Sequence, residues 1–174
     1  DGNTKGVEFL LKKNGIDAYH GLGRVAGAGR VEVLSEDGGN QMLETKNIVI
    51  ATGSEPTPLP GVAFEAGKVV DSTGALSLPA VPKKLIVVGA GIIGLELGSV
   101  WRRLGAEVTV VEAAERILPA YDAELTKPVG AALKRLGVAL RLGSSVLGLN
   151  AAGDGVRVKD ANGEETVLAA DRVL

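Results

Sequence analysis

The sequence contains no cysteine, a single histidine and only 3% aromatic residues. Without cysteine, the chain has no disulfide, thiolate metal site or thiol nucleophile of its own. Few aromatic rings and a formal net charge of −2 argue against nucleic-acid binding, which uses stacking platforms and a basic surface. No apolar run approaches the roughly 20 residues that span a bilayer, so we expect no membrane partner. His20 has no nucleophile in evident context and is interpreted as a polar residue at a strand edge, so we expect no catalytic residue and no metal site.

Glycine, by contrast, is abundant, with 25 residues in a chain of 174. A hydrophobic share of 45% and a charged share of 23% are typical of a globular protein with a core. The length fits one domain or two small ones. The chain starts at Asp1 without methionine and stops within residues 170–174, which read as the beginning of an apolar strand. We therefore interpret it as an internal piece of a longer protein.

The first part of the chain is expected to hold a helix at residues 5–13 and short strands at 17–20, 24–26, 30–34 and 42–44. The run KNIVIA at 46–51 is typical of a buried parallel strand. Thr52, Gly53 and Ser54 follow it, and a glycine turn at the carboxyl end of a parallel strand is a common nucleotide site. Because every strand ends in a turn, that signal is weak. Proline and glycine crowd residues 55–61, and prolines recur before residue 83, so residues 56–82 are interpreted as a linker.

The second part, residues 83–174, carries a β-α-β-α-β pattern. Strands are expected at 85–88, 107–111 and 138–142, and helices at 92–104 and about 122–136. This order predicts an α/β fold of the Rossmann type, a parallel sheet with helices on its faces. Runs at 146–149, 155–159 and 165–168 predict a small antiparallel meander after it, with Asn162-Gly163 as a hairpin turn.

The clearest motif lies between the first strand and helix of that pattern, where Gly89, Ala90, Gly91, Ile92, Ile93 and Gly94 form a G-x-G-x-x-G sequence. An apolar strand precedes it, and an amphipathic helix and a second strand follow it, which is the context of a dinucleotide-binding fingerprint. Gly89 allows the tight turn, Gly91 lets a pyrophosphate approach the backbone N–H groups, and Gly94 lets the helix pack closely on the sheet. Gly98 extends that close-packed stripe.

Glu112 ends the second strand, where a carboxylate can accept hydrogen bonds from both adenosine ribose hydroxyls. A 2′-phosphate would meet this charge, so NAD is favoured over NADP. Arg116 could in principle serve a 2′-phosphate, but we interpret it as a residue that caps or solvates the loop.

Glu96 stands in an otherwise apolar first half of the helix. It is either a surface carboxylate favoured by the helix dipole or a carboxylate directed at the nicotinamide half of the cofactor. The residues alone leave both interpretations open.

With these motifs in hand, the chain resembles the flavin-dependent pyridine nucleotide–disulfide oxidoreductases, and within them the dihydrolipoamide dehydrogenases, along essentially its whole length. The most specific segments are residues 45–56 (TKNIVIATGSEP), 71–76 (DSTGAL) and 89–105. The resemblance implies that residues 1–55 are the C-terminal side of an FAD-binding domain. It assigns Gly23, Thr52, Gly53 and Ser54 to FAD. It assigns the range from Gly89 through Leu95, together with Glu96, Glu112 and Val146, to NAD binding. Within that site, Glu96 lies toward the nicotinamide and Val146 at the adenine.

The same resemblance implies a homodimeric enzyme that serves 2-oxo acid dehydrogenase complexes and their lipoyl domains, in bacterial cytoplasm or the mitochondrial matrix. In that family a redox disulfide passes electrons from dihydrolipoamide through FAD to NAD. The family's first FAD fingerprint, its disulfide and its His–Glu base are not among these residues, so we expect the chain alone to be inactive. The alternatives are another flavin oxidoreductase, such as an NADH oxidase, and a nucleotide-sensing module without catalysis.

Overall fold

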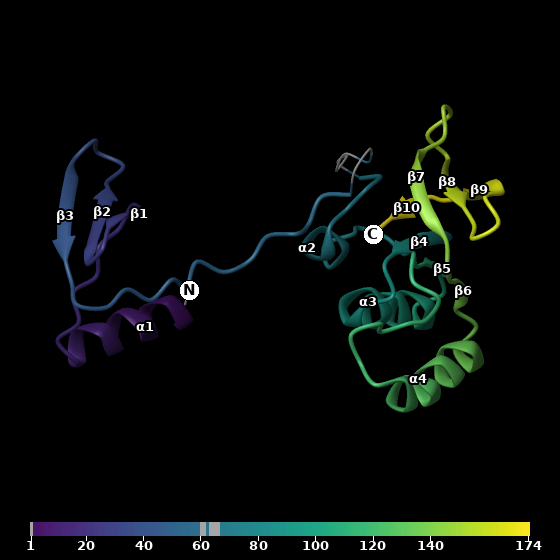
Figure 1. Ribbon diagram of the computed structural model, residues 1–174, viewed down its shortest axis with the longest axis horizontal. Helices are drawn as coiled ribbons and strands as arrows, with labels where there is room; N and C mark the ends of the chain where they lie inside the picture. The colour runs from purple at the N-terminus through teal and green to yellow at the C-terminus, as the bar shows by residue number, and fades with distance from the viewer. Residues whose placement is uncertain (1, 60–61, 63–66) are drawn as a thin grey trace. The chain divides into compact units, whose positions relative to one another are not determined.

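A computed structural model describes residues 2–59, 62 and 67–174. The chain forms two compact units, Asp1–Ser54 and Glu55–Leu174, and each is described by itself. The order of the elements along the chain can be followed in Figure 1.

The first unit combines a helix with an antiparallel sheet. Helix α1 (Gly2–Lys13) precedes strands β1 (Leu22–Gly27), β2 (Arg30–Leu34) and β3 (Asn40–Glu44), which pair in the order β1-β2-β3. Arg24 on β1 forms an ion pair with Glu32 on β2 across the hairpin. No residue of α1 is buried, and Val33 is the only buried core residue of the described part of this unit.

Two expected strands of this unit are absent from the structure, so both predictions are wrong. Residues 17–20, including His20, adopt no regular structure and pair with none of the strands in the described part of this unit. Residues 46–51 are not a strand either, and Val49 and Ile50 are 87% and 74% exposed. A parallel strand needs a parallel neighbour, and the sheet of this unit is antiparallel throughout.

The second unit contains the expected alternating elements around a parallel sheet. Strand β4 (Lys84–Val88) leads into helix α3 (Ile92–Arg103), strand β5 (Glu107–Val111), helix α4 (Ala123–Leu136) and strand β6 (Ala139–Arg141). Strand β10 (Arg172–Val173) returns beside β4, giving the order β10-β4-β5-β6 with all pairs parallel. Val69 forms a parallel bridge to Val173 on the outer side of β10.

The ends of α4 show why this helix has these limits. The Asp122 side chain accepts a hydrogen bond from the Glu124 N–H at 2.8 Å, which caps the first turn. Gly137 at the other end has φ +83°, a left-handed conformation that favours glycine and stops the helix.

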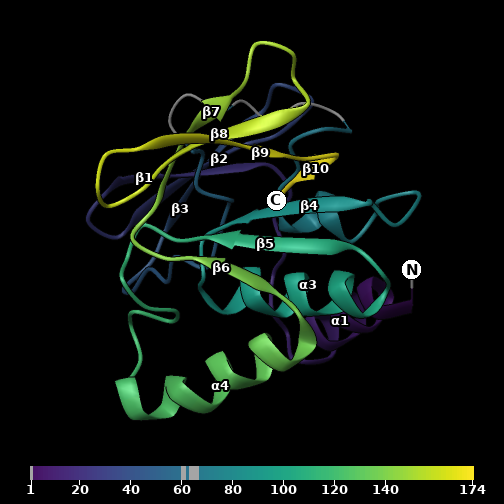
Figure 2. The same ribbon diagram turned by 90° about the vertical axis from the view of Figure 1, so that its right-hand side faces the viewer.

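The parallel sheet is covered by helices on one face only, which corrects the expectation of helices on both faces. Figure 2 shows α3 and α4 on one side of β4–β5–β6 and strands β7 (Ser145–Leu149), β8 (Gly155–Lys159) and β9 (Glu165–Ala169) on the other. These three strands form the expected antiparallel meander. The alternate side chains Val156 and Val158 of β8 are buried, so the meander supplies the apolar cover that a second layer of helices would give.

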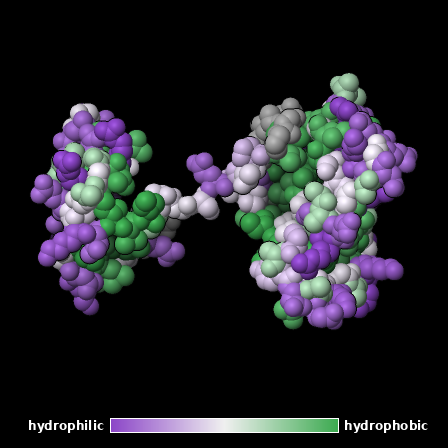
Figure 3. All heavy atoms as spheres, viewed as in Figure 1, coloured by the Kyte–Doolittle hydropathy of each residue, from purple (hydrophilic) through white to green (hydrophobic). Residues whose placement is uncertain are grey.

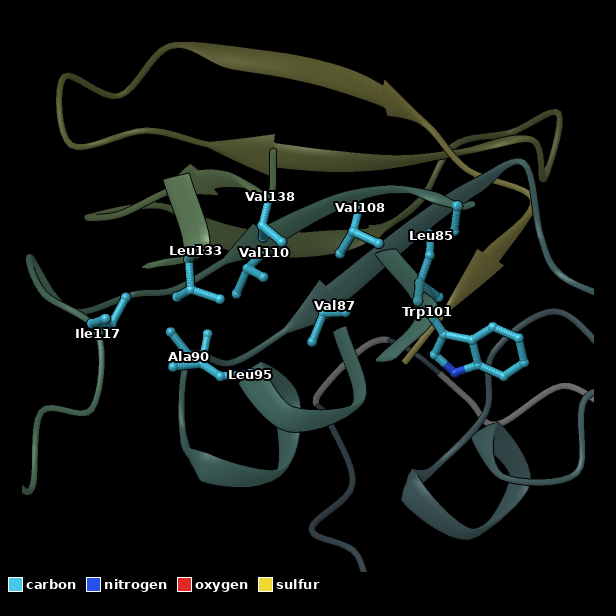
Figure 4. Close-up of a cluster of buried hydrophobic side chains, with 11 residues drawn as sticks. Leu85, Val87, Ala90, Leu95, Trp101, Val108, Val110, Ile117, Leu133 and Val138 are labelled. Carbon is cyan, nitrogen blue, oxygen red and sulfur yellow. The ribbon is translucent and has the colours of Figure 1, made fainter. Parts of the chain in front are cut away.

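Two core clusters follow from this layering. Figure 4 shows the cluster on the helix side, where Val87 of β4 and Val110 of β5 lie with Leu95 and Trp101 of α3 and Leu133 of α4. The intervening residues of the strands face the meander, in a cluster that contains Ile86, Val111, Val156, Val158 and Val173. Period-two alternation along β4 and β5 therefore produces both clusters.

Described residues that precede β4 also take part in the second unit. A short helix, α2 (Ser72–Ala75), begins after Asp71, whose side chain accepts a hydrogen bond from the Gly74 N–H at 2.7 Å. Val62 and Val69 belong to the cluster on the meander side. Among the described residues, no helix combines the length and apolar character needed to cross a membrane.

Candidate nucleotide-binding site

The glycine-rich turn between β4 and α3 has the backbone geometry that a bound phosphate requires. Gly89 has φ +101°, a value that L side chains rarely adopt, so the tight turn depends on glycine. Gly91 is the N-cap of α3, and no side chain caps the helix there. A Cβ atom on Gly91 would meet no atom within 4 Å, so the space above the helix end is open. The first N–H groups of the helix have no intrahelical partner and favour an anion.

Gly94 is needed for close packing. A Cβ atom there would lie 2.2 Å from the Gly89 carbonyl oxygen and 3.1 Å from Val87 Cγ1. Gly98, one turn later, is less constrained than the stripe interpretation implies, because a Cβ atom would meet Val108 and Val87 at 3.5 Å, ordinary contact distances. Only the first of these helical glycines is required by the packing.

Glu112, directly after β5, connects two backbone segments. One carboxylate oxygen, Oε2, accepts a hydrogen bond from the Ala90 N–H at 2.7 Å, and the other, Oε1, accepts one from the Ala114 N–H at 2.8 Å. The side chain is half-buried. A carboxylate oxygen has a second lone pair, so these bonds leave acceptor capacity for ribose hydroxyls. The residue therefore also fixes the glycine-rich turn, a role that the motif alone does not reveal.

The loop after Glu112 closes on the same turn. The Leu118 N–H donates to the Ala90 carbonyl oxygen at 2.9 Å, and Leu118 is the one described non-glycine residue with positive φ, at +48°. The Arg116 guanidinium donates to the carbonyl oxygens of Tyr121 at 2.8 Å and Pro119 at 2.6 Å. These bonds agree with the interpretation of Arg116 as a residue that caps the loop.

A cleft of about 730 Å³ lies beside the glycine-rich turn. Figure 3 shows apolar side chains on this face of the second unit, next to α2 and the C-terminal residues. The cleft lies at the ends of the neighbouring strands β4 and β10. The strand order reverses between these two strands, and this is the usual ligand position in open α/β sheets. Its wall includes the turn and start of α3, the segment before α2, the loop before α4, and the last strand (Gly89, Gly91, Ile92, Ile93, Gly94, Val70, Asp71, Ser72, Ala120, Tyr121, Val173 and Leu174).

Five of the residues assigned to NAD lie outside the lining of this cleft: Ala90, Leu95, Glu96, Glu112 and Val146. Glu96 is exposed in the second turn of α3, and no hydrogen bond or ion pair reaches it from the described residues. Val146 on β7 is half-buried and packs against the cluster on the meander side. Leu95 is buried in the other core cluster, so its side chain serves packing.

The residues assigned to FAD are all exposed in the first unit. Gly23 is exposed in β1 and pairs with Val33. Thr52, Gly53 and Ser54 are exposed and irregular, although Gly53 has φ +79° and so needs glycine. With residues 46–51 not in a strand, the premise of a turn at a strand end fails here. The first unit alone does not fit FAD.

Comparison with known proteins identifies the family. The model of the pyridine nucleotide-disulphide oxidoreductase family matches residues 2–174. The chain belongs to this family. Enzymes of the family use FAD and NAD(H).

Curated relatives in this family include dihydrolipoyl dehydrogenase 3 of Pseudomonas putida, 53% identical over 99% of the chain, and a leghemoglobin reductase of Vigna unguiculata, 48% identical over 98%. A mitochondrial dihydrolipoyl dehydrogenase of Pisum sativum is 45% identical. The chain spans 38%, 33% and 35% of the lengths of these three proteins.

Solved structures of the family give the same fold. LpdA of Mycobacterium tuberculosis matches 99% of the chain and 39% of its own length, with a TM-score of 0.80 and 25% identity. The HOCl-induced flavoprotein disulfide reductase RclA of Escherichia coli, in its Cu(II) complex, matches 98% of the chain with a TM-score of 0.73 and 30% identity. The expected α/β fold is thereby confirmed.

Several residues at the family's candidate site carry no signal in the sequence. The bond from the Leu118 N–H to Ala90 is formed by the backbone and does not depend on the type of side chain. Asp71 and Ser72 reach the cleft because Val69 pairs with Val173 far along the chain. The resemblance at residues 71–76 marked this segment, but not its place beside the glycine-rich turn.

Proposed function

We propose that the second unit binds NAD(H) as the pyridine-nucleotide domain of a dihydrolipoyl dehydrogenase. The observation that carries this proposal is the uncapped N-terminus of α3, reached through open space above Gly91 and flanked by the Glu112 carboxylate. The positive end of a helix stabilises a pyrophosphate, and the carboxylate accepts hydrogen bonds from a ribose diol.

The residues present fit the nucleotide in a defined order. The N–H groups of Gly91, Ile92 and Ile93 would hold the pyrophosphate, and Gly94 keeps α3 close enough to the turn to present them. Glu112 would hold the adenosine ribose. We assign Val146 to the adenine side and Glu96 to the nicotinamide side. Bound NAD⁺ supplies the hydride acceptor, and the chain's own contribution is to bind and orient it.

We propose further that the complete protein is a homodimeric dihydrolipoyl dehydrogenase of a 2-oxo acid dehydrogenase complex, acting on its lipoyl domains. The identity with dihydrolipoyl dehydrogenases from bacteria and plant mitochondria supports this activity. It also supports the bacterial cytoplasm or the mitochondrial matrix as the location. The redox disulfide must come from residues outside this chain, since it contains no cysteine.

For the first unit we propose a share in FAD binding that is completed only by other parts of the protein. Gly23, Thr52, Gly53 and Ser54 are all exposed, which leaves their backbone accessible to a further domain segment. We derive no step through FAD from these residues.

A calorimetric titration of the purified 174-residue chain with NADH tests the proposal. We expect saturable binding of one NADH per chain. Absence of binding by a chain whose second unit is folded would contradict it. The full reading frame of the gene distinguishes a disulfide oxidoreductase from a nucleotide-sensing module without catalysis. A C-x₄-C pair upstream supports the oxidoreductase, and a stop codon soon after Leu174 supports the sensing module.

A further inference from the structure

The loop that follows Glu112 is hydrogen-bonded to the Ala90–Gly91 peptide group, which carries the first N–H of the proposed anion site. The Ala90 carbonyl accepts the Leu118 N–H at 2.9 Å, and Ala90 itself is fully buried. The Ala90 carbonyl and the Gly91 N–H belong to one planar trans peptide and point in opposite directions. The bond to Leu118 therefore fixes the direction of the Gly91 N–H.

Leu118 makes this bond from a backbone conformation that leucine rarely adopts. Its φ of +48° is in the left-handed region, which persists in non-glycine residues only where the surroundings impose it. The Tyr121 N–H donates to the Leu118 carbonyl at 2.9 Å, so residues 118–121 form a tight turn. Ile117 before it is 6% exposed and anchored in the core cluster on the helix side.

Arg116 fastens this turn from outside. Its Nη1 donates to the Tyr121 carbonyl and its Nη2 to the Pro119 carbonyl, so one planar guanidinium joins the second and the last residue of the turn. No carboxylate lies within ion-pair distance of it among the described residues. Its donors serve the loop, and the loop holds the Ala90–Gly91 peptide. Ala120 and Tyr121 of the same loop also line the cleft.

We propose that Arg116 is a positioning residue for the nucleotide: it acts through the 118–121 turn to hold the Ala90–Gly91 peptide in its anion-binding orientation. This inference rests on the proposed NAD(H) site and extends it to a residue that touches no part of the cofactor. Because the pyrophosphate is common to both dinucleotides, the effect of Arg116 is the same for NADH and NADPH.

The test compares Arg116→Gln and Arg116→Lys with Arg135→Gln, which removes an exposed arginine of α4 that has no bond among the described residues. NADH and NADPH affinities are measured by calorimetry on the 174-residue chain, and folding by urea denaturation. We expect Arg116→Gln to weaken both nucleotides about tenfold at an unchanged unfolding midpoint. Lysine, a single point donor, is expected to restore part of the loss. Arg135→Gln is expected to bind like the unmodified chain.

Amide hydrogen exchange distinguishes the positioning role of Arg116 from a general role in packing. In the free chain, Arg116→Gln should speed exchange of the Leu118 amide, with the Trp101 and Val110 amides unaffected. Unchanged NADH binding in Arg116→Gln overturns the inference and leaves the NAD(H) proposal standing. A loss confined to NADPH overturns it too, because the guanidinium would then meet the 2′-phosphate. No NADH binding by the unmodified folded chain overturns both.

Discussion

The carboxylate of Glu112 accepts the backbone N–H of Ala90 at 2.7 Å, across 22 positions of sequence. Its other oxygen accepts the N–H of Ala114. A residue expected only to meet a ribose thus also holds the turn that meets the pyrophosphate, so its substitution acts on folding as well as on binding.

Replacing Glu112 by glutamine should lower the free energy of unfolding of the second unit. An amide retains one acceptor oxygen, and its NH₂ group would face the remaining backbone donor. We expect a loss of about 1–3 kcal/mol, the cost of leaving a buried donor unpaired. Urea denaturation followed by fluorescence of Trp101, the only tryptophan, reports on this unit. Glu115→Gln, at an exposed position in the same loop, is the control and should change stability by less than about 0.5 kcal/mol.

Glu112 should also determine cofactor choice. We expect NADH to bind at least tenfold more tightly than NADPH, a difference of about 1.4 kcal/mol or more. The diol contact is charge-assisted and worth roughly 1.5–3 kcal/mol. Glu112→Ala should weaken NADH and narrow the preference, as measured by parallel titrations. Equal affinities in the unmodified chain would place the specificity elsewhere.

Gly94 and Gly98 form a matched pair within one helix. Gly94→Ala places a methyl group 2.2 Å from the Gly89 carbonyl oxygen, so the turn must shift. We expect a loss of about 1–3 kcal/mol in stability and weaker NADH binding. Gly98→Ala meets only 3.5 Å contacts and should leave binding unchanged, with stability equal or higher by about 0.4–1 kcal/mol. Equal behaviour of the two variants would contradict the packing argument.

Gly91→Val separates binding from folding. The side chain would enter open space, and φ of −76° suits any residue, so we expect stability to fall by no more than about 1 kcal/mol, the cost of a poorer N-cap. Valine would occupy the approach of the pyrophosphate, so NADH and NADPH should weaken together. Titration of both nucleotides tests this, and undiminished binding would show that the phosphates lie elsewhere.

The chain alone should not oxidise dihydrolipoamide. That reaction requires a thiol–disulfide exchange, and the sequence contains no cysteine. Incubation of the purified chain with dihydrolipoamide, FAD and NAD⁺ should produce no NADH above the rate without protein. Protein-dependent NADH formation would contradict this.

The sequence predicts the second unit well because the elements that bury one another there are all present. The strand before Gly89, both helices and the meander appear close to their expected limits, since strong period-two and helical patterns coincide with real caps such as Asp122 and Gly137. The sequence did not predict that the meander covers the face of the parallel sheet opposite α3 and α4. Periodicity shows that β8 has a buried face, but it does not show what that face packs against.

The first unit shows the opposite case. The KNIVIA run has the composition of a buried strand, yet Val49 and Ile50 are exposed, because pairing depends on a neighbour that composition does not provide. Similarly, the sequence indicates that Arg116 caps the loop, but the two carbonyl groups that it bonds are set by the loop's path.

The pairing of β10 with β4 and Val69 has a kinetic consequence. The bond from the Lys84 N–H to Asp171 joins residues 87 positions apart, and the bond from Lys68 to the Ala170 carbonyl spans 102. Contacts of such long sequence separation form late and slow folding. On the ribosome, the edge of β4 that borders the cleft therefore stays open until nearly all of the second unit has been synthesised. Until then this edge is exposed to non-native partners.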